Sequence, residues 1–257
     1  MQQKLLNFYN QNGYLISNLK NKKILKKLRK RFISIFNETS KINLKKEIKN
    51  DQDIIKLYRS KNRKFWTGVY DIIKLDPLVY ELSSQKEFVD IAKKLGLKNP
   101  SFGTRPQVRI DMPNDPKFSF KSHQDYQFNL GSKNSITIWI PLQTVTKNNG
   151  ALQISKRSHL GLKNYLYGRK NKFNIDLEKN VKKKVLKKDH YDLSLDDKKF
   201  NFESIDINIG EALVFSQFLV HKSGLNNSNN IRFTIQLRFT DLADREYAKS
   251  NYFLFFR

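Results

Sequence analysis

Residues 210–239 read GEALVFSQFLVHKSGLNNSNNIRFTIQLRF and contain two apolar stretches on either side of a turn-rich segment. The stretches over 211–220 and 231–239 are rich in Val, Ile, Phe and Thr, which are typical of β-strands. The segment between them, KSGLNNSNN, carries the Gly, Asn and Ser residues that form turns. This part of the chain therefore predicts two strands joined by a turn, with His221 where the first strand ends and Arg232 where the second begins.

Similar short strands are predicted through the rest of the second half. They are TRPQVRIDM, SITIWIPLQ, GALQIS and ESIDINIG, which alternate or run apolar and are separated by Gly, Asn and Pro. Because no strong helix lies between them, they favour an antiparallel barrel or sandwich over a parallel α/β sheet. Residues 163–200 interrupt the strands with many lysines and aspartates and no clear periodicity, and we interpret them as a surface insertion.

The first third of the chain has a helical pattern. Residues 18–37, NLKNKKILKKLRKRFISIFN, alternate apolar residues with lysines at the spacing of an amphipathic helix. A second helix is predicted within SSQKEFVDIAKKLGL, which opens with Ser and closes with Lys-Lys and Gly. We therefore expect a single domain over 1–257. Its parts are a mainly helical flank (1–100), a β core (101–162 and 201–245) and the insertion (163–200).

The composition narrows the chemistry. A chain of 257 residues can bury one large core, and the absence of cysteine excludes disulfides, thiolate nucleophiles and iron–sulfur clusters. Any metal must therefore be held by His, Asp and Glu. No apolar run approaches the roughly 18 residues of a membrane span, and the N-terminal sequence lacks the pattern of a signal peptide, so a cytoplasmic protein is expected.

The net charge is +25, from 49 Lys+Arg against 24 Asp+Glu. Such a balance is typical of proteins that bind nucleic acid, anionic lipid or another acidic partner. The excess is mostly lysine, however, and it accompanies abundant Asn and Ile, which share AT-rich codons. Genome composition and selected attraction both remain open as its cause. Since the chain has no zinc finger, RNP-like signature or heptad array, no specific nucleic-acid partner is expected.

Residues 120–130, FKSHQDYQFNL, place a histidine two residues before a carboxylate. In an extended segment alternate side chains share a face, so His123 and Asp125 can be directed to one point. Such a pair also fits a structural or surface role. His221 is the candidate for a third ligand, and two histidines with one carboxylate leave three positions of an octahedron open, as in non-haem Fe(II) oxygenases.

Arg232 lies eleven residues after His221 (232 minus 221). A guanidinium there could bind a carboxylate through two hydrogen bonds, which is what 2-oxoglutarate needs at the end remote from iron. Taken alone, Arg232 also fits an exposed arginine at a strand end.

The chain resembles the phytanoyl-CoA dioxygenase family of Fe(II)/2-oxoglutarate-dependent oxygenases over most of its length. The resemblance is carried by FYNQNGYLIS, SHQDYQ, WIPLQTVTKNNGALQISKRSHLG and the stretch 210–239, in that order. It implies a mainly β fold, a double-stranded β-helix or jelly roll, with the N-terminal helices packed outside. This expectation agrees with the change from helices to strands along the sequence.

The same resemblance implies roles for individual residues. The implied iron ligands are His123, Asp125 and His221, and the implied 2-oxoglutarate contacts are Arg232, Ser223, Gln107 and Trp139. The expected cofactors are Fe(II), 2-oxoglutarate and O2, with 2-oxoglutarate converted to succinate and CO2 while a substrate C–H bond is hydroxylated. Related halogenases replace the carboxylate ligand with a small residue, so its retention favours hydroxylation.

The substrate is expected to be a small or carrier-linked metabolite. Tyr126 and Asn129 could face it, or could serve as wall packing and a turn cap. By alternation, Arg105 and Arg109 before the metal motif and Arg238 on the last strand could point inward and bind an anionic substrate. Alternatively they point outward or pair with Asp111 and Asp241. A non-catalytic jelly-roll binding protein and a basic nucleic-acid-binding or nucleic-acid-modifying protein are the competing hypotheses.

Overall fold

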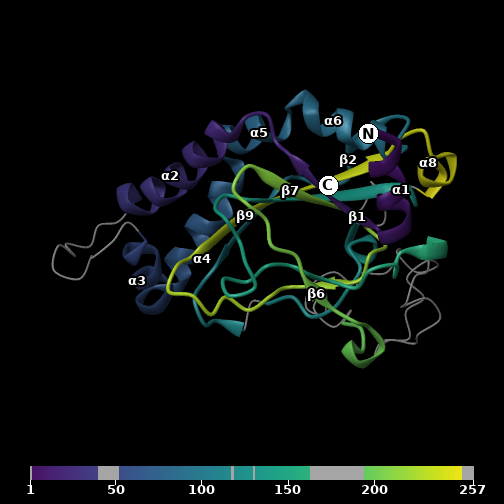
Figure 1. Cartoon of the computed structure of the whole chain (residues 1–257). Coiled ribbons are helices and arrows are strands. Elements are labelled where there is room, and N and C mark those ends of the chain that lie inside the picture. Colours follow the sequence, from purple (N-terminus) through teal and green to yellow (C-terminus); the bar gives the residue numbers. More distant parts are fainter. Residues whose placement is uncertain (1, 40–51, 117–118, 130, 163–193, 251–257) are drawn as a thin grey trace.

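The computed structural model describes residues 2–39, 52–116, 119–129, 131–162 and 194–250, which form two β-sheets with helices around them (Figure 1). The helices on the N-terminal side are α1 (Gln2–Asn12), α2 (Lys22–Thr39), α3 (Asp53–Lys61), α4 (Arg63–Ile72), α5 (Pro77–Ser83) and α6 (Lys86–Lys94). The shorter helical segments are η1 (Ile73–Leu75), α7 (Tyr126–Asn129), η3 (Leu160–Leu162), η5 (Asp197–Lys199) and α8 (Arg245–Ser250). Most of the expected insertion, residues 163–193, lies outside the described residues.

The larger sheet is antiparallel, with the strand order β1-β7-β4-β9-β2 and with β3 also paired to β9. Its strands are β1 (Tyr14–Asn18), β2 (Pro100–Phe102), β3 (Gln107–Asp111), β4 (Ser135–Pro141), β7 (Glu211–Ser216) and β9 (Arg232–Asp241). The smaller sheet has the order β6-β5-β8 and consists of β5 (Gln153–Ile154), β6 (Glu203–Ser204) and β8 (His221–Lys222). The antiparallel arrangement favoured by the sequence is thus found.

The two faces of the larger sheet pack against different layers. In β9, Phe233, Ile235 and Leu237 join a core shared with the helices. On the neighbouring strand, Trp139 belongs instead to a second core that includes Ile154 of the smaller sheet. Figure 1 agrees with this division, since α2, α5 and α6 cover one side of the larger sheet and β6 lies on the other. Because side chains alternate along a strand, the polar residues of β9 face the space between the sheets.

The helices follow from their sequence patterns. The predicted first helix is α2, in which Leu25, Leu28 and Phe32 are fully buried while most of its lysines are exposed. The second predicted helix is α6, which lies within the expected segment and is followed by Gly96 at φ +96°, a left-handed conformation that favours glycine. No helix in the described part of the chain is both long enough and apolar enough to cross a bilayer.

The sequence was wrong about the strand that precedes His221. The strand does not continue to the histidine. β7 ends at Ser216, and a turn then carries the chain into the smaller sheet, where His221 is the first residue of β8. The turn is held by Ser216, whose carbonyl accepts from the N–H of Leu219 (2.9 Å) and whose Oγ accepts from the N–H of Phe218 (3.2 Å). This crossing places His221 between the two sheets.

Candidate metal centre

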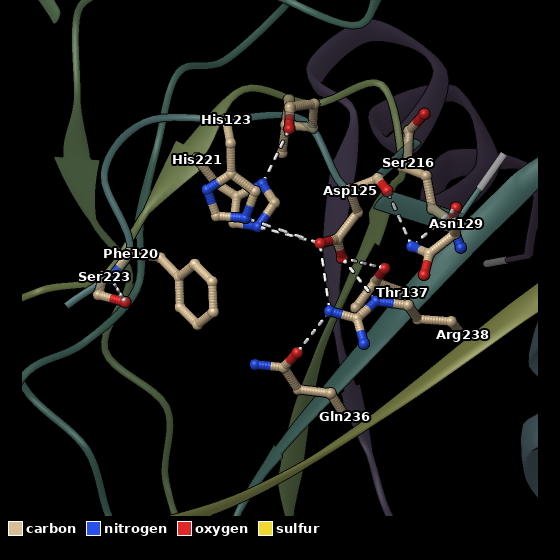
Figure 2. Close-up of polar contacts among 12 residues, drawn as sticks. Phe120, His123, Asp125, Asn129, Thr137, Ser216, His221, Ser223, Gln236 and Arg238 are labelled. Carbon is tan, nitrogen blue, oxygen red and sulfur yellow. Dashed lines mark hydrogen bonds and ion pairs between the residues drawn. The ribbon is translucent and has the colours of Figure 1, made fainter. Parts of the chain in front are cut away.

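Three buried side chains, His123, Asp125 and His221, come together between the sheets (Figure 2). Their candidate ligand atoms all lie within 4.8 Å of one another. Oδ1 of Asp125 lies 3.7 Å from Nε2 of His123 and 3.8 Å from Nε2 of His221. The backbones of the two histidines form an antiparallel bridge, with N–H to carbonyl distances of 2.9 and 3.0 Å, which holds the imidazoles side by side.

The hydrogen bonds of the imidazoles leave both Nε2 lone pairs available. Nδ1 of His123 lies 2.7 Å from the carbonyl of Lys121, and Nδ1 of His221 lies 3.0 Å from the carbonyl of Leu219. A carbonyl can only accept, so each Nδ1 carries a proton and each Nε2 is the ring nitrogen that faces Asp125. Burial, together with the nearby His123, lowers the pKa of His221 to about 4, which keeps this imidazole neutral at neutral pH.

Asp125 lies at the start of a turn and not within an extended segment as predicted. The N–H groups of Phe128 and Asn129 donate to its backbone carbonyl (3.0 and 3.2 Å), and α7 follows directly. The extended conformation is thus confined to the bridge at His123. Because the turn still directs the carboxylate at the imidazoles, the predicted pair meets by a different local geometry.

The Asp125 carboxylate is held by two other side chains from the larger sheet (Figure 2). Thr137 of β4 donates from Oγ1 to Oδ2 at 2.6 Å. Arg238 of β9 donates from Nε to Oδ2 at 3.3 Å and from Nη2 to Oδ1 at 3.2 Å. Burial raises the pKa of the Asp125 carboxyl, but Arg238 and the two histidines outweigh burial and hold the pKa well below its usual range. Asp125 is therefore an anion.

A second polar group on the same face surrounds Arg232. Its Nη2 lies 2.9 Å from Oδ2 of Asp111, whose other oxygen accepts from Nη2 of Arg109 at 2.5 Å. Burial raises the pKa of the Asp111 carboxyl, but the two guanidinium groups outweigh burial and hold it below its usual value. Two arginines thus share one carboxylate, which leaves this group with a net positive charge.

Arg232 also has donors that the protein does not use. Its side chain is 3% exposed, and within the described part of the chain its Nε and Nη1 have no hydrogen-bond partner. Gly150 leaves the space beside Nη1 open, because a Cβ on this residue would lie 2.6 Å from that atom. The ring of Trp139 lies on the same face of the larger sheet as Arg232, with its centroid 5.9 Å from Cζ of the arginine. Buried N–H groups without acceptors are rare in proteins, so these two donors of Arg232 are suited to an anion.

The other expected 2-oxoglutarate contacts differ in their surroundings. Ser223 uses its Oγ to accept from the backbone N–H of Phe120 at 3.0 Å. Gln107 lies on β3 in register with Gln236, and its side-chain amide donates to the carbonyl of Arg105 at 3.1 Å. Ser223 and Gln107 thus each already have a hydrogen bond within the protein.

The residues predicted to meet a substrate are only partly placed near the centre. Asn129 is buried and donates to the carbonyl of Asp125 at 2.8 Å, which agrees with the alternative of a capping role. Tyr126 stacks on Phe218 with centroids 4.2 Å apart, which agrees with wall packing. Arg105 was expected on the strand before the metal motif, but it is exposed and lies before β3, which begins at Gln107. The strand does not extend back to Arg105, because Pro106 has no N–H to donate to a neighbouring strand.

The pairing alternative for the arginines is found in part. Arg109 pairs with Asp111, as that alternative proposed, and it lies over the ring of Phe120 at 4.5 Å. Arg238 points inward, but it meets Asp125 and not Asp241. The carboxylate of Asp241 accepts from the N–H groups of residues 98, 99 and 243.

Sequence reasoning missed Thr137 and Gln236. Thr137 is fully buried in the middle of SITIWIP, and a polar residue inside an apolar strand was the available signal. Gln236 accepts from Nη2 of Arg238 at 2.8 Å. It shares the alternate positions of β9 with Arg232 and Arg238, so alternation could have included it.

Comparison with known proteins agrees with this arrangement. The family model described as Phytanoyl-CoA dioxygenase (PhyH) matches residues 9–234. No curated protein matches the chain by sequence.

Several solved structures share the fold. One is SnoN, described as a non-heme alpha ketoglutarate dependent epimerase from nogalamycin biosynthesis (12% identity, 93% of this chain and 83% of that chain covered, TM-score 0.56). Another is EctD from S. alaskensis with 2-oxoglutarate and 5-hydroxyectoine (12% identity, 94% and 77% covered, TM-score 0.58). A third is SnoK, a non-heme alpha ketoglutarate dependent carbocyclase (16% identity, 94% and 84% covered, TM-score 0.54). At these identities the likeness concerns the fold alone.

Proposed function

Because the chain belongs to the phytanoyl-CoA dioxygenase family, we propose that it is an Fe(II)/2-oxoglutarate-dependent oxygenase that hydroxylates a C–H bond of a small or carrier-linked metabolite. One observation carries the proposal: the Nε2 lone pairs of His123 and His221 and the carboxylate of Asp125 are directed at one point. The family comprises oxygenases, but the neighbours in structure include an epimerase and a carbocyclase, so hydroxylation is the more specific part of the proposal.

The donor set fits iron. Two neutral imidazoles and one carboxylate form a combination that binds Fe(II) on one face and leaves further positions for a cosubstrate and O2. His123, Asp125 and His221 would hold the metal. When bound, iron would activate O2, which would oxidise 2-oxoglutarate to succinate and CO2 with one oxygen atom and hydroxylate the substrate C–H bond with the other. The protein itself holds each imidazole through its Nδ1, at the carbonyls of Lys121 and Leu219, so that Nε2 is the nitrogen that would bind the metal.

The pocket of Arg232 fits the distal carboxylate of 2-oxoglutarate. Its buried Nε and Nη1 lie on different sides of the guanidinium, and each of them can donate a charge-assisted hydrogen bond to a carboxylate oxygen. Asp111 occupies Nη2 and holds the guanidinium in place, while Arg109 offsets part of the charge of Asp111. Trp139 and Gly150 would shape the pocket, with Ser223 and Gln107 as further contacts carried over from the family resemblance.

The arginine pairs weaken the argument for an anionic substrate. Arg109 and Arg238, two of the candidates for binding a substrate anion, are partly buried, and each contacts a carboxylate of the protein. A negative charge on the substrate would thus be recognised at the exposed Arg105, while Tyr126 and Asn129 serve the wall of the site.

As part of the same proposal, the two sheets form the double-stranded β-helix of the family, and residues 1–257 work as one catalytic domain. The second core cluster, which contains residues of both sheets, supports this arrangement. The insertion at 163–200 would then supply specificity at the surface.

The test compares two buried histidines, one within the cluster and one outside it. We expect the wild-type protein with Fe(II) to convert 2-oxoglutarate to succinate slowly without substrate, and His221→Ala to lose this turnover by about 100-fold or more. The matched control is His159→Gln, because His159 is also buried but contacts the carbonyl of Asn10, outside the cluster. Equal losses in the two variants, or wild-type turnover that does not need iron, would exclude the proposed function.

A further inference from the structure

Arg238 donates a hydrogen bond to each oxygen of Asp125, the candidate metal-binding carboxylate (Figure 2). Its Nη2 also donates to Gln236 at 2.8 Å, which fixes the plane of the guanidinium. Both partners are largely removed from water, with side-chain exposures of 14% for Arg238 and 2% for Asp125. The ion pair is therefore screened far less than one on the surface.

The charges around this pair can be counted. Histidines ligate a metal in their neutral form, so in the metal-binding state Asp125 carries the only charge of the ligand set. Arg238 cancels that charge, and the ligand set together with Arg238 is neutral before a metal binds. A divalent ion would bring this group to +2. Without the arginine, the same ligands would change from −1 to +1.

We propose that Arg238 is a positioning residue whose fixed charge weakens the binding of a bare divalent metal and strengthens the binding of 2-oxoglutarate to the metal-loaded site. This inference rests on the proposed function. The metal would share Oδ1 of Asp125 with Nη2 of Arg238, so the two cations compete for one anion. The dianionic cosubstrate, in contrast, would meet a site that carries one positive charge more.

A purely structural role for Arg238 has a different signature. If the arginine only held Asp125 in position, its loss would disorder the carboxylate and weaken both binding steps. Thr137 provides the comparison, because it donates to Oδ2 of the same carboxylate at 2.6 Å without bringing a charge. The two roles are distinguished by the sign of the change in metal affinity.

The experiment measures two equilibria by calorimetry: Mn(II) binding to the metal-free protein, and 2-oxoglutarate binding to the Mn(II)-loaded protein without oxygen chemistry. In Arg238→Gln we expect Mn(II) to bind about tenfold tighter and 2-oxoglutarate about tenfold weaker, each corresponding to one removed unit charge in a partly screened site. Arg238→Lys keeps the charge and should leave both constants within about threefold of wild type. Thr137→Val should weaken Mn(II) binding or leave it unchanged.

Several outcomes would overturn the inference. Weaker or unchanged Mn(II) binding in Arg238→Gln would show that the arginine acts through structure, and a lysine variant equal to the glutamine variant would show that charge is not the cause. Arg238→Met, a second neutral replacement of similar length, decides the matter if the glutamine variant does not fold. Asp125→Ala separates this inference from the proposed function: if that variant binds Mn(II) like wild type, the metal site itself is wrong.

Discussion

The two faces of β9 carry different residues and face different surroundings. Phe233 and Leu237 are fully buried against the helices, whereas Arg232 and Arg238, at alternate positions, lie between the sheets, where Arg232 is buried and Arg238 is 14% exposed. Burial of the helix-facing apolar side chains stabilises the folded protein. On the other face, each of the two arginines contacts a carboxylate. One strand thus supplies stability on one side and binding chemistry on the other. Substitutions on the two faces should be separable by what they change.

The largest change in stability is expected on the helix-facing side. Phe233→Ala removes a side chain that is 0% exposed in the helix-facing core and should lower the free energy of unfolding by about 3 to 5 kcal/mol. Mn(II) affinity, measured where the protein is still folded, should stay near the wild-type value. Denaturant unfolding followed by circular dichroism measures the first quantity.

The adjacent residue gives the matched control. Thr234 points to the other face, and its buried Oγ1 has no hydrogen-bond partner in the described part of the chain. Thr234→Val should therefore leave the free energy of unfolding unchanged or raise it slightly. A loss of stability comparable to that of Phe233→Ala would mean that the two faces do not divide their roles as described.

A slightly smaller effect, seen in binding and not in stability, is expected at Arg232. Arg232→Ala should weaken 2-oxoglutarate binding to the Mn(II)-loaded protein by about 2 to 5 kcal/mol, because one partner of a buried charge-assisted pair is lost. Arg232→Lys should recover only part of this, since a point charge does not reproduce the fork. The fold should persist, because Arg109 still pairs with Asp111.

The exposed Arg105 provides the control for charge. Arg105→Ala removes the same formal charge from the surface and should not change the dissociation constant for 2-oxoglutarate measurably. If Arg105→Ala and Arg232→Ala were equally impaired, the buried position of Arg232 would have no special role.

Local sequence patterns predicted the main helices and strands because burial imposes their periodicity. The pattern of α2 and the alternation of β9 are both properties of neighbouring residues. The end of β7 was not predicted, because Val, Phe and Leu continue through the turn, and the hydrogen bonds of Ser216 that form the turn leave no apolar signal.

In the candidate site, too, features set by neighbouring residues were predicted, and the ion pairs between distant parts of the chain were not. Residue types and family resemblance predicted that His123, Asp125 and His221 lie together, and the structure brings their ligand atoms within 4.8 Å of one another. Alternation also predicted that Arg232 and Arg238 share a face. It did not predict that one arginine would meet Asp111 and the other Asp125, because strand register and the path of the turn decide which acid each cation reaches.

The most direct measurement is a crystal structure of the protein with Mn(II) and 2-oxoglutarate, in which anomalous scattering locates the metal. We expect one metal peak about 2.0 to 2.3 Å from Nε2 of His123, Nε2 of His221 and Oδ1 of Asp125. The distal carboxylate of 2-oxoglutarate should accept a hydrogen bond from Nη1 or Nε of Arg232. A metal bound away from these three side chains, or a distal carboxylate held by Arg109 or Arg238, would contradict the proposed site.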